Sequence, residues 1–219
     1  MRRFEEELEE LKNKLLEMSG LVESAVYRSV LVLTEGDSEQ AQEVLKNERR
    51  INQMEIEIDD AATSLLALQQ PMAVDLRFLT AAIKINNDLE RMGDLAVNIV
   101  ERALSLMQQP TVKPLIDIPH MAKLTESMVR KSLDAFVRKD PELARSVLTS
   151  DDAVDDLRDT IYQELIRNMQ EDPSSTPQCV NLMFVARNLE RIADHATNIA
   201  EDVLFLVQGV DVRHHAEQH

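Results

Sequence analysis

Two acidic pairs recur at equivalent places in the two halves of this chain of 219 residues. Glu90 and Asp94 are four residues apart, and Glu190 and Asp194 repeat the same spacing. On a helix, residues four apart lie on one face, one turn from each other. Carboxylates held that close repel each other unless one is protonated or a cation lies between them. The spacing therefore makes a cation site one interpretation of these residues.

The second half contains a further acidic pair, in the helical segment that precedes Glu190 and Asp194. Asp151 and Asp155 align, 103 positions on, with Glu48 and Asn52 of the first half. If the second and third helices of each half pack antiparallel, the two pairs face each other, and three or four carboxylates converge. We therefore expect Asp155 to lie close to Asp194 on one side of the bundle.

The ligand types limit which cation such a site would hold. Oxygen ligands suit hard cations such as Mg, Ca, Mn or oxidised iron, whereas zinc usually takes His or Cys. Two other interpretations stay open: a solvated acidic face, or inter-helix salt bridges that include Glu90 with Arg91 and Glu190 with Arg191. His195 follows Asp194 directly, and a lone helical histidine is predicted to be structural or exposed rather than a ligand.

No arrangement of residues points clearly to catalysis. The four glycines cannot form a phosphate-binding loop, and the repeat contains no Glu-x-x-His motif of the kind found in di-metal oxidases. We therefore predict a non-catalytic protein. The alternative is a metal-dependent enzyme that uses the same carboxylates, which would lose turnover on Asp155→Ala or Asp194→Ala without losing its fold.

Composition favours helix throughout and restricts the partners. Hydrophobic residues make up 44% of the chain and aromatic residues 3%, with only 4 Gly and 7 Pro. The single cysteine excludes a disulfide framework, and neither a membrane-spanning run nor a secretory signal is recognisable, so a soluble intracellular protein is expected. A net charge of -16 disfavours nucleic acid and anionic membranes, and suits cations or basic patches on proteins.

The chain also contains an internal duplication. Helical spacing of apolar residues predicts segments over about 3–35, 37–70 and 72–107, followed by a proline-containing linker over 108–119. Identical residues recur at an offset of 103 in the early part of the second half and at 100 near its end. The predicted fold is all-α, two tandem three-helix bundles. The predicted division is 1–109 for the first bundle, 115–210 for the second and 211–219 for a polar tail.

Several motifs of the chain resemble those of the PhoU family of phosphate-uptake regulators. The resemblance rests on LERMGDLAVNIVE and LERIADHATNIAE, and on the NERRIN, DDAVDD, QPMAVDLR and DVRHH segments. It implies a cytoplasmic protein of two three-helix bundles, often dimeric. It also implies that the protein restrains the high-affinity phosphate ABC transporter, through its ATPase, and represses the phosphate-starvation response through a phosphate-sensing histidine kinase. A relative that accompanies a low-affinity phosphate permease is the alternative.

The same resemblance implies multinuclear iron or zinc clusters on two sets of residues. By position, the first cluster comprises Glu48, Asn52, Glu90 and Asp94, and the second comprises Asp151, Asp155, Glu190 and Asp194. Asn52 departs from the acidic motif and reduces the charge of the first cluster. We therefore expect the second cluster to fill with metal first.

Overall fold

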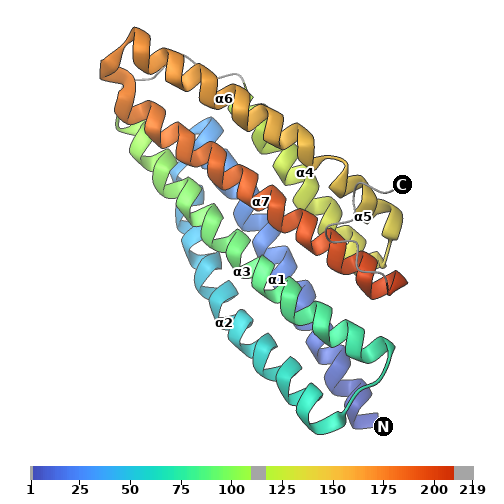
Figure 1. Ribbon diagram of the computed structural model, residues 1–219. Coiled ribbons are helices and arrows are strands. Elements are labelled where there is room, and N and C mark those ends of the chain that lie inside the picture. The colour runs from blue at the N-terminus through green and yellow to red at the C-terminus, as the bar shows by residue number, and fades with distance from the viewer. Residues whose placement is uncertain (1, 110–116, 210–219) are drawn as a thin grey trace.

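The computed structural model describes residues 2–109 and 117–209, and these form helices without any strand (Figure 1). The helices are α1 (Arg2–Glu35), α2 (Ser38–Gln69), α3 (Val74–Met107), α4 (Asp117–Arg138), α5 (Pro141–Leu148), α6 (Asp151–Glu171), the short 3-10 helix η1 (Pro173–Ser175) and α7 (Thr176–Gln208). None of the helices in these ranges is long and apolar enough to cross a bilayer. The all-α prediction is confirmed.

The first bundle consists of α1, α2 and α3, which pack against one another. The connection between α1 and α2 is short. Gly36 adopts a positive φ of 69° that ends α1, and Asp37 caps α2 by accepting a hydrogen bond from the Glu39 amide. Apolar side chains at helical spacing fill the space between the helices, among them Leu15, Met54 and Leu89, all fully buried.

The second bundle consists of α4, the α5–α6 pair and α7. It differs from the prediction in one respect, because the segment that matches the continuous α2 is broken between α5 and α6. The hydroxyls of Thr149 and Ser150 both donate to the Ser146 carbonyl, at 3.1 and 2.9 Å, and so compete with the helical hydrogen bonds at this point. The break places Asp151 in the first turn of α6.

The linker is also shorter than predicted. Helix α4 begins at Asp117, so the last residues of the predicted 108–119 linker belong to a helix. Residues 110–116 and the predicted polar tail lie outside the described residues. The change of the repeat offset from 103 to 100 amounts to a deletion of three residues, and the short η1 turn that leads into α7 accommodates it.

The two bundles join through α3 and α7, which run side by side along the centre of the molecule (Figure 1). Lys84 of α3 forms an ion pair of 3.0 Å with the buried Asp202 of α7. At the repeat offset of 100, Lys84 and Asp202 correspond to Phe184 and Arg102, and the Arg102 guanidinium lies 4.7 Å from the centre of the Phe184 ring. Equivalent positions therefore meet twice across this interface, once as an ion pair and once as a cation–π contact.

Candidate functional site

The second cluster lies where α6 and α7 pack together (Figure 1). Burial, together with the charges of Asp194, Asp155 and Glu190, raises the pKa of Asp151 from 3.8 to about 6. The four predicted residues therefore act on one another electrostatically. The structure brings all of them to one place on the second bundle.

Asp155 and Asp194 are close, as the sequence predicted. Burial raises the pKa of Asp194, and the carboxylates of Glu190 and Asp155 raise it as well. His195 makes its own contact elsewhere, since its Nδ1 lies 2.7 Å from Asp88 Oδ1 on α3. This histidine therefore joins the two bundles, which agrees with its predicted structural role.

An arginine lies at the centre of this acidic cluster, and the sequence analysis did not single it out. The Arg158 guanidinium donates to Glu190 Oε1 at 2.7 Å, to Asp155 Oδ1 at 3.1 Å and to Asp159 Oδ1 at 2.9 Å. Burial opposes the charge of Arg158, but these carboxylates raise the pKa of its guanidinium. Glu190 thus makes an inter-helix salt bridge, as one interpretation foresaw, with Arg158 in place of Arg191.

The first cluster is organised differently on α2 and α3. Asn52 Nδ2 donates to Glu48 Oε1 at 2.6 Å, while the buried Asn52 Oδ1 has no hydrogen-bond partner. Burial raises the pKa of Glu90, and the nearby charges of Asp94 and Glu55 add to this effect. The only basic side chain near Glu90 among these contacts is that of its neighbour Arg91, at 3.5 Å.

Glu55 is the second residue that the sequence analysis missed, and the repeat explains its importance. At the offset of 103, Glu55 occupies the position of Arg158. The first cluster thus has a carboxylate where the second has a guanidinium. The sequence carries part of this signal, because Arg158 is three residues after Asp155 and so lies on the same face of its helix, a spacing that other charged residues share.

The two clusters differ in how well they suit a metal ion. Within residues 2–109 and 117–209, no three His, Cys, Asp or Glu side chains are gathered closely enough to hold one as they stand. In the second cluster, Arg158 is hydrogen-bonded to Asp155 and Glu190, so a metal would have to compete with its guanidinium for these two carboxylates. In the first cluster, Asn52 Oδ1 has no hydrogen-bond partner and the basic side chain near Glu90 is that of Arg91, at 3.5 Å, so the oxygen donors of this cluster fit a hard cation better.

Close packing holds the first cluster in position. Gly93 lies between Glu90 and Asp94 on α3, and a Cβ atom at Gly93 would come within 3.2 Å of Ile51 Cδ1 on α2. In the second bundle, the equivalent residues are Ala193 and Val154. In the first bundle, the smaller Gly93 thus faces the larger Ile51. In the second bundle, the larger Ala193 is matched by the smaller Val154.

Both halves of the chain match a known family. Residues 15–103 and 118–203 each match the family described as the PhoU domain. The chain belongs to the PhoU family. The PhoU match occurs once in each half, as the internal repeat requires.

Individual members of the PhoU family are similar over nearly the whole chain. The phosphate-specific transport system accessory protein PhoU homolog of Pseudomonas putida is 43% identical over 96% of this chain and 83% of that protein. The crystal structure of PhoU from Pseudomonas aeruginosa superposes with a TM-score of 0.91 at 41% identity, over 94% of this chain and all of that one. PhoU from Streptococcus pneumoniae gives a TM-score of 0.86 at 31% identity, over 95% of this chain and 99% of that one.

Proposed function

We propose that this chain is a cytoplasmic, non-catalytic regulator that restrains the high-affinity phosphate ABC transporter and represses the phosphate-starvation response. Membership of the PhoU family makes it an accessory protein of phosphate transport and not an enzyme. The finer proposal, that it acts through the transporter's ATPase and a phosphate-sensing histidine kinase, is supported chiefly by the PhoU-domain match in both halves.

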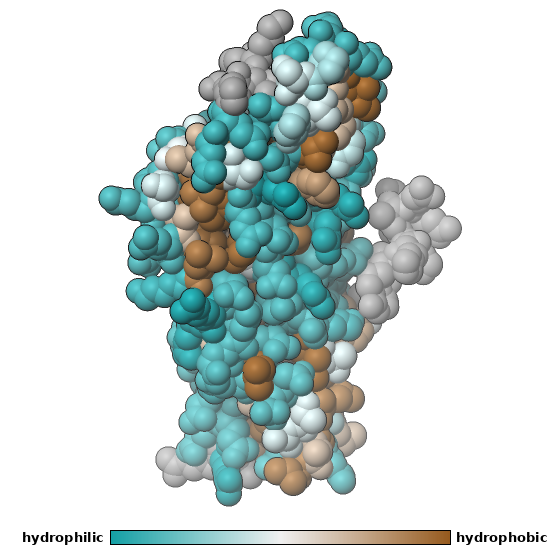
Figure 2. All heavy atoms as spheres, turned by 90° about the vertical axis from the view of Figure 1, so that its left-hand side faces the viewer, coloured by the Kyte–Doolittle hydropathy of each residue, from teal (hydrophilic) through white to brown (hydrophobic). Residues whose placement is uncertain are grey.

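The charge of the molecule fits such an adaptor. A net charge of -16 on long helices gives an acidic surface, and complementary charge on a partner speeds encounter. One face of the molecule is largely hydrophilic, with small separate hydrophobic patches (Figure 2). A basic surface on the ATPase or on the kinase would match this face. Binding should therefore weaken as the salt concentration rises.

A cation at the first cluster is a second part of the proposal. Asn52, Glu90 and Asp94 would hold it through oxygen atoms, and the cation would relieve the repulsion that raises the pKa of Glu90. Iron or zinc follows from the family resemblance, and Mg, Ca or Mn from the oxygen ligands. Because Arg158 would compete with a metal for Asp155 and Glu190, we expect the first cluster to bind metal before the second, the reverse of the expectation from sequence.

The metal proposal is tested on protein purified without added metal. Elemental analysis of the wild type should find metal that is lost in a Glu90→Gln, Asp94→Asn variant and retained in a Glu190→Gln, Asp194→Asn variant. Loss of metal only from the second variant would contradict this assignment. Light scattering on the same samples tests the homodimer that the family resemblance implies.

The regulatory proposal is tested in cells. Deleting the gene should raise phosphate uptake and switch on a starvation reporter in phosphate-rich medium, and a plasmid copy should reverse both changes. Wild-type levels of uptake and reporter in the deletion strain would contradict the proposal. Capture of a low-affinity permease instead of the ABC transporter's ATPase would indicate the alternative system.

A further inference from the structure

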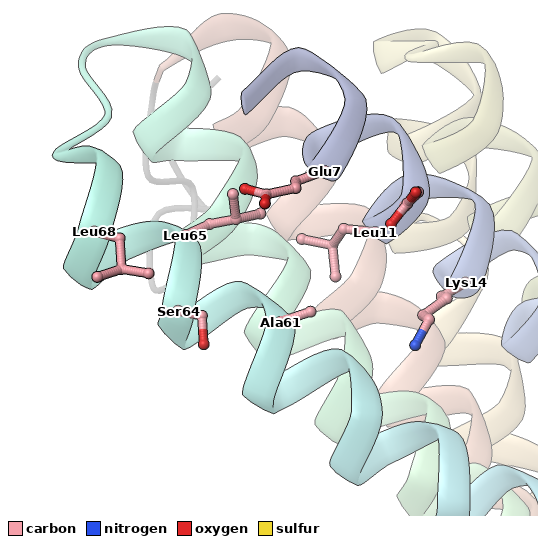
Figure 3. Close-up of a pocket in the computed structure, with 8 residues that line it drawn as sticks. Glu7, Leu11, Lys14, Ala61, Ser64, Leu65 and Leu68 are labelled. Carbon is pink, nitrogen blue, oxygen red and sulfur yellow. The ribbon is translucent and has the colours of Figure 1, made fainter. Parts of the chain in front are cut away.

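A groove with an apolar floor and polar or charged walls opens at the far end of the first bundle, away from the carboxylate clusters. It has a volume of about 230 Å³ and lies between the first turns of α1 and the last turns of α2 (Figure 3). Leu11 and Leu65 form its buried floor, Ala61 lies beside them and Leu68 stands at the edge. Pockets for drug-sized ligands usually measure about 300–1,000 Å³, so this space suits the end of an apolar side chain better than a cofactor.

The apolar surface continues from the groove onto the connection between α2 and α3. Leu68 and Met72 are 78% and 81% exposed, and they are the two most exposed large hydrophobic residues in the described part of the chain. Next along the chain, Val74 and Leu76 are 57% and 44% exposed. Figure 2 shows hydrophobic surface at the lower end of the molecule, which is the end that carries this connection in Figure 1. Single exposed leucines are ordinary, but four such residues within nine form a patch.

The backbone of this connection is held in an uncommon conformation. Gln70 and Ala73 have φ values of 47° and 49°, and neither is a glycine. Side chains with a Cβ disfavour this region by about 1–2 kcal/mol per residue. The chain thus keeps Met72 exposed on a strained turn, which is a feature that functional loops often show.

Negative charge borders the groove. Glu7 and Glu10 line it, and residues 3–14 of α1 contain five glutamates against three basic residues. Lys14 at the groove is paired at 2.9 Å with Glu57 of α2, and Glu7 is paired at 2.9 Å with Arg3, so the excess of glutamate over this stretch makes the border acidic. An apolar centre with an acidic border fits a partner that carries apolar side chains flanked by lysine or arginine.

We propose that the groove of Leu11, Ala61, Leu65 and Leu68, together with exposed Met72, is the docking site for a basic amphipathic helix of a partner protein. The identity of this partner rests on the proposed function, which makes it the ATPase of the phosphate transporter. An amphipathic helix presents apolar residues at i, i+3 or i+4 to such a groove. A second copy of this chain would bring the same glutamates face to face, and an anionic membrane would meet the same repulsion.

The test measures binding of the full-length chain to the purified ATPase subunit of the same organism by biolayer interferometry. A Leu68→Ser, Met72→Ser variant should weaken the affinity by about tenfold or more, since it removes the two largest exposed apolar contacts. A Glu7→Lys, Glu10→Lys variant should slow association and reduce the dependence on salt. Leu45→Ser with Ile166→Ser is the matched control, because both residues are exposed and apolar but distant from the groove in sequence.

The outcomes separate this proposal from the one on which it rests. If the wild type does not bind the ATPase, the proposed partner is wrong, and the docking assignment falls with it. If the wild type binds and the groove variant binds equally well, the docking site is wrong and the proposed function stands. Self-association of the wild type that the groove variant abolishes, without any change in ATPase binding, would assign the groove to a second copy and overturn the proposal.

Discussion

Arg158 donates to Glu190 across 2.7 Å and so ties α6 to α7 at the centre of an acidic cluster. Its side chain is 24% exposed and that of Glu190 is 19% exposed, so the pair is shielded from much of the solvent. Glu55 takes the place of Arg158 in the first bundle. At this position, the duplication has therefore left an arginine in the second cluster and a glutamate in the first.

Replacing Arg158 with glutamine should destabilise the protein and open the second cluster to metal. The change leaves Asp155, Asp159 and Glu190 without a counter-charge, and we expect a loss of about 1–3 kcal/mol in the free energy of unfolding. Added Mn²⁺ should raise the melting temperature of this variant more than that of the wild type. Arg167→Gln, an exposed change on the same helix, is the control and should respond to Mn²⁺ like the wild type.

The pH dependence of stability should change when Asp151 is replaced by asparagine. Because the folded pKa of Asp151 is about 6 and its ordinary value is 3.8, folding takes up a proton between these values, and ionisation of Asp151 opposes folding above pH 6. A two-unit shift corresponds to about 3 kcal/mol, which solvent screening at this partly exposed site reduces to about 1 kcal/mol. Asp151→Asn should therefore stabilise the fold by about that amount at pH 7.5 and leave it unchanged below pH 4.

Urea denaturation at several pH values measures this effect. Asp156→Asn is a suitable control, since Asp156 is an exposed aspartate on the same helix, α6. A stabilisation of the Asp151 variant that is the same at pH 4 and pH 7.5 would show that its ionisation is not the cause.

Helical periodicity and the repeat were enough to predict most of the fold. The apolar spacing of α1, with Leu11, Leu15 and Met18 all buried, defines a helix face directly. The break at Thr149 and Ser150 was missed because it depends on hydroxyl groups that compete for a backbone carbonyl, which leaves no mark on the hydrophobic pattern.

The candidate site was predicted in outline but not in its charge balance. Motif spacing placed Asp155 near Asp194, because antiparallel helices bring the two rows together. The importance of Arg158 and Glu55 depends on which side chain points between the helices, and spacing alone does not separate these two from other charged residues. Contacts such as that of His195 with Asp88 could not be predicted for another reason. Nothing in the sequence of either half indicates that α3 packs against α7.

The ion pair between Lys84 and Asp202 should contribute strongly to the joining of the two bundles. The Asp202 side chain is only 7% exposed, so Lys84→Met leaves a carboxylate without its lysine partner in a poorly solvated place. We expect a loss of about 2–4 kcal/mol. Asp202→Leu should lower the free energy of unfolding by less in the Lys84→Met background than in the wild type. A double-mutant cycle by urea denaturation measures this difference. The exposed pair of Arg3 and Glu7 is the control, with an expected coupling of about 0–1 kcal/mol.

Gly93 and Ile51 should be energetically coupled, because their sizes match across the contact between α2 and α3. Alanine at position 93 favours the helix by about 0.5–1 kcal/mol, but its Cβ would crowd Ile51 at 3.2 Å. Ile51→Val alone should cost about 0.5–1.5 kcal/mol by leaving space beside the glycine. In the Gly93→Ala background the same change should cost clearly less, because valine and alanine are the pair found at Val154 and Ala193. Equal costs of Ile51→Val in the two backgrounds, measured by urea denaturation, would mean that the packing of Gly93 against Ile51 does not determine how closely the two helices approach.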